Sequence, residues 1–265
     1  MKNKTSIIKK IINSIYNIDE FPKYVIDGVK KALLYAFVLS ILTGGIKGII
    51  DFVKINSYMN DIVNTLNQDE YNFKIVDNRL NLENSPVTIN QDRILFYIDD
   101  SIELDKANDL RKIIENEDVN ILILKDGLAF ETNGDYDSIE DFEIHYSDMN
   151  IDEDITSIDI INTIESSKKM LSIFAIGSDV VQEFIMYIVS AFLIALLTII
   201  PSKLLGVNYR LGDLFSLVVY AYTLPNLLVL ALNIVFPHIV FDMAGMIGAM
   251  VYTYLAIRNI RKQIN

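Results

Sequence analysis

The sequence predicts a polytopic α-helical membrane protein with four transmembrane helices and an inserted extracytoplasmic α+β domain. Hydrophobic residues make up 51% of the 265-residue chain, although it carries 35 acidic side chains. The two kinds are segregated: residues 51–183 hold 30 acidic and 10 basic side chains, and the rest of the chain holds 5 acidic and 13 basic ones. Long uncharged stretches therefore flank a strongly acidic, water-facing region. This composition excludes a purely soluble enzyme.

The first predicted span covers residues 32–53 and follows an amphipathic cytoplasmic segment, residues 1–31. Residues 32–46 carry no charge, and Lys47 can extend its ammonium group to the membrane surface. About 30 residues precede this stretch, which favours an uncleaved span over a signal peptide. The preceding isoleucines share one helical face, so this segment either lies among lipid headgroups or packs on the cytoplasmic ends of the bundle. They are Ile7, Ile8, Ile11, Ile12 and Ile15.

Three further spans are predicted in the C-terminal third, at residues 179–201, 214–235 and 239–257. A bilayer core about 30 Å thick needs about 20 helical residues. The apolar stretch from residue 214 to 241 is too long for one span and too short for two. Since proline ends or kinks a helix, Pro237 indicates a break near Phe236, after which the apolar pattern resumes.

Basic residues predict the orientation of these spans in the plasma membrane. Residues 1–31 carry seven lysines. Further Lys and Arg residues lie in the loop 202–213 and in the tail 258–265. With four spans, all three segments fall on one side, which the positive-inside rule identifies as cytoplasmic. Both termini are therefore expected inside the cell, and residues 54–178 outside it.

Residues 54–178 alternate short apolar runs with turn signals, as expected for a domain of helices and strands. Asp77-Asn78 predicts a hairpin turn, and residues 86–89 are expected to extend the hairpin's sheet. The continuous apolar run 94–98 predicts a central strand. The remaining expected elements are a helix at 104–115, strands at 119–124 and 128–132, an edge strand at 142–146, and a helix at 155–174 that leads into the second span.

No catalytic residue and no cofactor is predicted for this domain. The chain contains no cysteine, and it lacks the common zinc-protease, serine-hydrolase and phosphate-loop motifs. Asp99 and Asp100 follow an apolar strand, where carboxylates can bind metal or transfer protons. Their simpler interpretation is that they begin a loop and cap the helix that starts near Leu104.

A weak calcium candidate lies near the end of the domain. Its oxygen-bearing side chains are spaced like those of a calcium loop, but Glu153 stands where the sharp turn needs glycine. A solvated acidic linker is the alternative interpretation. The candidate ligands are Asp148, Asn150, Asp152, Asp154 and Asp159.

Polar residues inside the predicted spans form the second candidate site. Asp242 follows His238 by one helical turn, so the two side chains are expected to share a hydrogen bond or a proton. Pro225-Asn226 lies within the third span, where proline frees backbone carbonyl groups. These four residues indicate either a path for a solute or proton, or a kinked bundle with one acid near the interface.

The segment Asn208–Phe215, NYRLGDLF, precedes an apolar run that ends at Leu224-Pro225. Together with the layout of one span, an outer domain and three clustered spans, it resembles the Gram-positive membrane family called domain of unknown function 1189. The segment is also similar to a helix of the Yip1-like membrane families. Some members of the 1189 family are labelled maltodextrin-utilisation proteins, so the resemblance implies an accessory role in carbohydrate uptake and no catalytic residues.

Two functions are compatible with these observations. The first is a non-enzymatic membrane protein whose outer domain binds a ligand or partner, as an uptake accessory or an envelope sensor or scaffold. Its expected partners are the lipid bilayer and another membrane protein or a second copy. Nucleic acid is excluded, because an acidic domain offers no Lys and Arg surface for phosphates. The alternative is a small transporter or channel that uses the polar residues of the last two spans.

Overall fold

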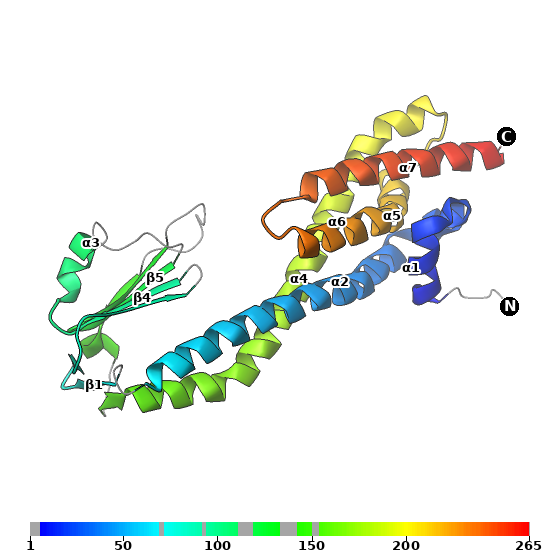
Figure 1. The fold of residues 1–265 in the computed structure, drawn as a ribbon. Coiled ribbons are helices and arrows are strands. Elements are labelled where there is room, and N and C mark those ends of the chain that lie inside the picture. The colour runs from blue at the N-terminus through cyan, green and yellow to red at the C-terminus, as the bar shows by residue number, and fades with distance from the viewer. Residues whose placement is uncertain are drawn as a thin grey trace. The chain divides into compact units, whose positions relative to one another are not determined.

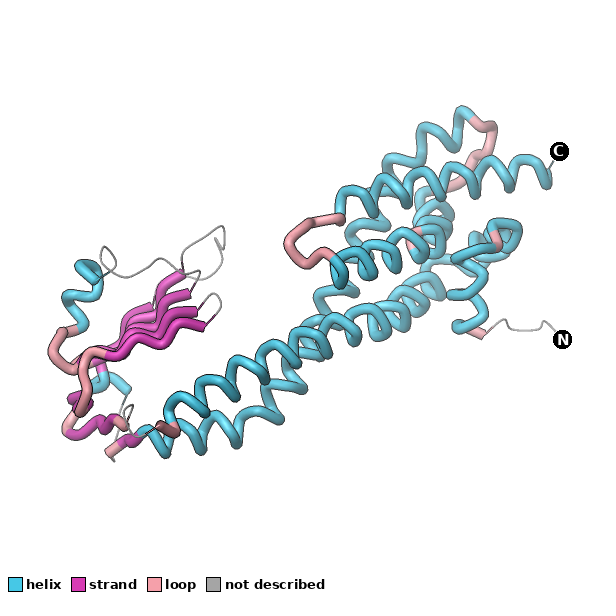
Figure 2. Tube along the Cα trace, in the orientation of Figure 1, coloured by secondary structure: helices cyan, strands magenta, loops and turns pink. Residues whose placement is uncertain are grey.

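The computed structural model describes residues 6–68, 72–91, 94–110, 119–132, 142–149 and 154–264. The chain forms two compact units, which we call the helical unit (Met1–Phe52 with Ser172–Asn265) and the sheet unit (Val53–Leu171). Every strand of the described chain belongs to the sheet unit (Figures 1 and 2).

Long helices supply most of the helical unit. The prediction that the helix at 155–174 leads into the second predicted span is confirmed, since both lie in one continuous helix, α4. Gly28, with a φ of 74°, interrupts the helical geometry of α2 near its start. The break predicted near Phe236 is confirmed. The helices are α1 (Ile7–Tyr16), α2 (Phe21–Leu66), α4 (Ser157–Leu204), α5 (Leu211–Ala221), α6 (Thr223–Val235) and α7 (Asp242–Ile264), with a short 3-10 turn, η1 (Ile18–Glu20).

Two helical stretches of the described chain are long and apolar enough to cross a membrane: Ile18–Asn64 and Ser157–Leu204. A third results if α5 and α6, which are bent by 41° at Tyr222, count as one span. By the same measure of length and composition α7 does not qualify, since it begins with Asp242 and its last turn is basic. The structure thus supports a membrane protein without establishing the four predicted spans.

Helix α1 packs against the rest of the helical unit. Its Ile7 and Ile11 side chains contact the unit's apolar core, and the Tyr252 hydroxyl donates to the Ile15 carbonyl oxygen at 3.1 Å. Ile8 and Ile12, each the next residue along the chain, remain exposed. The N-terminal helix therefore packs on the helical unit, as one of the two interpretations predicted. Its exposed isoleucines make no contact with the unit's apolar core.

The described strands of the sheet unit form two sheets. The smaller has the order β2-β1-β8, and the larger has the order β3-β4-β5-β6-β7. All pairings are antiparallel except β4 with β5, which are parallel and joined through the helical residues Leu104–Leu110. The strands are β1 (Phe73–Val76), β2 (Arg79–Leu82), β3 (Val87–Gln91), β4 (Ile94–Asp99), β5 (Val119–Leu124), β6 (Gly127–Thr132), β7 (Phe142–His145) and β8 (Ile155–Thr156); the 3-10 turns η3 (Leu104–Lys106) and η4 (Tyr146–Met149) and the short helix α3 (Ala107–Leu110) complete it.

Several strand predictions are confirmed. Asp77 and Asn78 adopt φ values of 50° and 60° between β1 and β2, as a tight hairpin turn requires. Strand β4 lies inside its sheet, with a strand on each side, and β7 lies at the edge. Of the predicted helix 104–115, the described part is helical, and residues 111–115 lie outside the described residues.

The prediction that residues 86–89 extend the hairpin's sheet is wrong, because β3 pairs with β4. The outward-facing amides of β2 already have other acceptors. Leu80 N donates to the Lys125 carbonyl oxygen at 2.7 Å, and Leu82 N donates to Asp100 Oδ2 at 3.0 Å. Strand β1, for its part, takes β8 on its free edge.

Both faces of the larger sheet are covered, which explains why β4 reads as a continuous apolar run. One face packs on the smaller sheet and on the end of α2, around Phe73, Ile98 and Tyr146. The other face packs against the helical residues Leu104–Leu110 that connect β4 to β5, which we call the crossover. Leu104 and Leu110 contact β5 and β6 there.

Candidate functional site

Two glycines bring α2 and α4 into backbone contact within the helical unit. A Cβ atom on Gly44 would lie 2.7 Å from Val180 Cα, and one on Gly48 would lie 2.6 Å from Ile176 Cα. Neither distance is possible for a real side chain, so only glycine permits this approach. Gly45 meets open space instead. The helices run antiparallel and lie side by side (Figure 1).

This close approach places Lys47 of α2 against Glu183 of α4. Glu183 is 7% exposed, and the Lys47 ammonium donates to its Oε2 atom. The other carboxylate oxygen, Oε1, accepts from Asn226 Nδ2 at 3.0 Å and from Thr43 Oγ1 at 3.3 Å. A buried carboxylate needs an opposite charge and hydrogen-bond donors, and this one has both.

A cavity of about 220 Å³ opens beside the ion pair. Among the described residues, its wall contains the carboxylates of Asp179, Glu183 and Asp242 and one ammonium group, on Lys47. The rings of Tyr187 and Tyr222 form an aromatic side, with centroids 4.9 Å apart. The other lining residues are Gln182, Met186, Ser190, Asn226, Val229, Leu230 and Met246. We call this the Glu183 cavity.

The structure brings two of the four intramembrane candidates to this cavity. Asn226 and Asp242 line it. Pro225 instead faces α7, where its Cβ atom lies 3.6 Å from the Cβ position of Gly248. His238 is exposed between α6 and α7, and within the described residues no hydrogen bond or ion pair joins it to Asp242.

Glu183, Lys47 and Asp179 were not among the site residues predicted from the sequence. Lys47 was assigned to the membrane surface. Both acids were counted in the acidic stretch 51–183, although the predicted second span, 179–201, includes them. A signal was present, because Gly44 and Gly48 flank Lys47 at the spacing of a close helix crossing, and Glu183 stands directly before an uncharged run. The partner of that crossing could not be identified without the pairing of α2 with α4.

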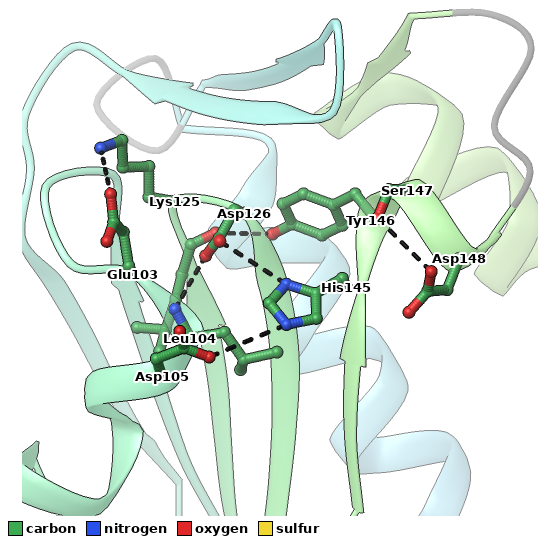
Figure 3. A network of polar contacts seen from close by, with 10 residues as sticks. Glu103, Leu104, Asp105, Lys125, Asp126, His145, Tyr146, Ser147 and Asp148 are labelled. Atoms are coloured by element: carbon green, nitrogen blue, oxygen red, sulfur yellow. Dashed lines mark hydrogen bonds and ion pairs between the residues drawn. The ribbon is translucent and has the colours of Figure 1, made fainter.

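The sheet unit holds a second polar cluster, around the β5–β6 turn (Figure 3). Asp126 Oδ1 accepts from Leu104 N at 2.7 Å, so Asp126 caps the crossover. Its Oδ2 atom lies 3.5 Å from His145 Nδ1, and His145 Nε2 lies 3.9 Å from Asp105 Oδ1. The Tyr146 hydroxyl donates to the Leu124 carbonyl oxygen at 2.9 Å. These contacts join β7 to the turn and the crossover, which is a structural role.

Asp99 is buried at the end of β4 and serves the loop that follows. It accepts from Ser101 N at 2.9 Å, Ser101 Oγ at 2.6 Å, Tyr97 Oη at 2.9 Å and Ser85 Oγ at 3.3 Å. Burial raises the pKa of Asp99, but these donors outweigh it, and the pKa lies below its usual value. For Tyr97, burial and then the hydrogen bond to Asp99 raise the pKa to about 12. The interpretation that Asp99 begins a loop is confirmed. The predicted cap at Leu104 is provided by Asp126 instead.

The calcium candidate is only partly within the described residues, since Asn150 and Asp152 lie outside them. The Asp159 carboxylate accepts from Thr156 N at 2.9 Å and from Thr156 Oγ1 at 2.6 Å, which caps α4 and lowers the pKa of Asp159. Asp148 accepts a long hydrogen bond from Ser147, and Asp154 is exposed. Across the described ranges, no three His, Asp or Glu side chains gather closely enough to hold a metal ion.

Comparison with known proteins gives one match. The family model described as "Protein of unknown function (DUF1189)" matches residues 8–257. No curated protein and no solved structure matches the chain.

Proposed function

The chain belongs to the DUF1189 family of proteins of unknown function, and on that premise we propose that it is a non-enzymatic, four-span protein of the plasma membrane. In this proposal the sheet unit is an extracytoplasmic domain that binds a ligand or a partner. The helical unit anchors it and docks another membrane protein or a second copy.

The fourth span is the part of this membrane topology that needs the most support. Its apolar segment, residues 243–257, lies between Asp242 and Arg258, so charges stand at both ends and none in between. Charged ends of this kind belong at the membrane surfaces. An odd number of spans would place the basic tail on the outer side, against the positive-inside rule.

Labelling of single cysteines tests this threading in intact cells. The chain has no cysteine of its own, and Asn81, Asn208 and Gln263 are exposed. With both termini cytoplasmic, a membrane-impermeant maleimide is expected to label Asn81→Cys but neither Asn208→Cys nor Gln263→Cys until the cells are opened. Labelling of Gln263→Cys in intact cells would show that α7 does not cross the membrane.

The observation that carries the binding function is the continuity of two helices. The chain passes from one unit to the other within α2 and within α4, and neither helix ends at the boundary between the units. These helices also hold the two halves of the buried ion pair, Lys47 and Glu183. Ligand binding that shifts one helix against the other therefore acts directly on that pair. Such an arrangement suits an uptake accessory or an envelope sensor.

Uptake of labelled maltohexaose tests the accessory role that the family resemblance implies. The matched variant removes residues 67–156 and joins α2 to α4 by a short glycine-serine linker. Lys168 Nζ donates to Asn60 Oδ1 at 2.8 Å, so the two helices are already side by side where the linker closes them. Cells lacking the protein are expected to regain uptake with the full chain but not with this variant at equal membrane abundance. Full uptake with the variant would contradict a recognition role for the sheet unit.

A small transporter is the second candidate, and the Glu183 cavity is the observation that favours it. Carboxylates within a helical bundle are costly and often mark the path of an ion or proton. Purified protein in proteoliposomes distinguishes the candidates. Proton or solute flux that disappears in Asp242→Asn would favour transport by the chain itself over binding.

A further inference from the structure

We propose that a cavity in the sheet unit binds a small amphiphile, a molecule with an apolar chain and a polar end that carries no negative charge. The cavity has a volume of about 380 Å³ and is lined by residues of both sheets, of η4 and of the first turns of α4. We call it the sheet-unit cavity. This inference rests on the proposal that the sheet unit binds a ligand, and it states where that ligand binds and to which chemical class it belongs.

Apolar side chains supply most of the wall of this cavity. Strands β5 and β6 of the larger sheet contribute Ile123 and Leu128, and β8 of the smaller sheet contributes Ile155. Ile160 and Ile164 come from the first turns of α4. Such a wall offers water few hydrogen bonds, and apolar cavities in proteins stay dry and bind hydrocarbons. The wall therefore favours an apolar occupant.

The polar side chains of the wall are already engaged. The Tyr146 hydroxyl donates to the Leu124 carbonyl oxygen at 2.9 Å. The Thr163 hydroxyl donates to the Asp159 carbonyl oxygen at 2.8 Å, and the Asp159 carboxylate accepts from Thr156. A sugar ring would give up its hydrogen bonds to water here and gain few in return, which costs affinity. An alkyl chain has none to give up, so the cavity selects the alkyl chain.

Exposed wall residues mark the place where the cavity opens to solvent. Met149 is 42% exposed, and Asp159 and Thr163 are exposed as well. The flexible Met149 side chain adapts to ligands of different shape. The Asp159 carboxylate repels an anionic head group and accepts a hydrogen bond from a hydroxyl or amino group. We therefore expect the polar end of the ligand at this opening, without a negative charge.

The cavity volume limits the length of the apolar chain. A volume of about 380 Å³ equals that of roughly thirteen waters in the liquid, at about 30 Å³ each. A protein cavity of about 150 Å³ already holds benzene, so the larger one here matches an alkyl chain of roughly eight to ten carbons.

An occupant of this cavity contacts the start of α4. Strand β8 ends at Thr156 and α4 begins at Ser157, so Ile155, Ile160 and Ile164 belong to one continuous segment of the wall. A ligand that packs against these side chains holds the start of α4 against the two sheets. Helix α4 continues from the sheet unit into the helical unit, so binding in the cavity acts on a helix of the membrane anchor. This contact suits an envelope sensor for amphiphiles.

Protection of single cysteines from a maleimide tests the site in the purified full-length protein in lipid nanodiscs. The probe is 1-octanol, and the chain has no cysteine of its own. Met149→Cys and Thr163→Cys place a thiol in the exposed part of the wall, and Asn81→Cys, on β2 of the same unit, is the matched control that does not line the cavity. Octanol at about ten times its dissociation constant is expected to slow labelling of both cavity thiols roughly tenfold, since only unoccupied protein reacts. Labelling of Asn81→Cys is expected to stay unchanged.

Further ligands and two filled variants define the chemical class. Maltose is expected to give no protection, and octanoate, which has the same chain with a carboxylate, is expected to protect less than octanol. Each methylene removed between 1-octanol and 1-hexanol is expected to weaken binding about fourfold, which corresponds to about 0.8 kcal/mol at equal free aqueous concentration. Leu128→Phe and Ile160→Phe fill the cavity and are expected to abolish the protection of Thr163→Cys. Circular dichroism confirms that these variants fold.

Three results would overturn the site. They are equal slowing of Asn81→Cys, no protection of either cavity thiol in folded protein, and protection that survives in both filled variants. Equal protection by octanoate would overturn the assignment of a ligand without negative charge. None of these results changes the outcome of the maltohexaose uptake assay, so failure of the cavity site and failure of the accessory role are distinguishable.

Discussion

Replacing Lys47 with methionine is expected to destabilise the helical unit by about 3 kcal/mol, because it leaves the buried Glu183 carboxylate without its counter-charge. Thr43 and Asn226 would still donate to Oε1, but Oε2 would lose its ammonium donor. The Lys47 side chain is 37% exposed, which places the expected loss at the lower end of what breaking a buried ion pair costs. Reversible unfolding in mixed detergent micelles measures the free energy.

A double-mutant cycle gives the control. Glu183→Gln is expected to cost less than Lys47→Met, since the long lysine side chain can move its ammonium toward water while glutamine keeps an oxygen for Asn226. The double variant Lys47→Met/Glu183→Gln is expected to recover most of the stability lost in Lys47→Met. Equal, additive losses in the two single variants would mean that the pair is not coupled.

Gly44→Ala is expected to separate α2 from α4, whereas Gly45→Ala is expected to be tolerated. The added methyl group at residue 44 would meet the backbone of Val180, which cannot rotate away. Overpacking of this kind costs about 1–3 kcal/mol. At residue 45 the methyl group enters open space, and alanine's better helix propensity adds up to about 1 kcal/mol of stability. The same unfolding assay compares the two variants.

The pair Gly48→Ala and Gly177→Ala repeats this comparison. Gly48 faces the backbone of Ile176, and Gly177 meets nothing within 4 Å. If all four variants had the same stability, the helix crossing at Gly44 and Gly48 would not be a tight contact, and the position of Lys47 would need another explanation.

Local sequence signals predicted most of the sheet unit. The turn residues Asp77 and Asn78 determine their hairpin through backbone preferences that act within four residues. The apolar run in β4 reflects burial on both faces. The sheet to which β3 belongs could not be predicted from local signals. It depends on the outer edge of β2, whose amides donate to Lys125 and Asp100 instead of to β3.

The candidate site was predictable only in part for the same reason. Asn226 and Asp242 stand out in the sequence because each interrupts or borders an apolar stretch. Glu183 also borders an apolar stretch, but it follows the strongly acidic stretch 51–183 and is indistinguishable from the other acids there. Its role depends on a lysine 136 positions earlier in the chain. Sequence periodicity within one helix carries no information about that pairing.

The pairing of β1 with β8 has a consequence for the order in which the protein is made. Lys74 aligns with Thr156, so the third strand of the smaller sheet emerges only after the whole larger sheet. Contacts between such distant segments form late in folding. Strand β8 ends at Thr156, and α4 begins with the next residue. During biosynthesis, the edge of β1 therefore stays unpaired until the chain leading into α4 has been synthesised, so closure of the smaller sheet and synthesis of α4 are neighbouring steps.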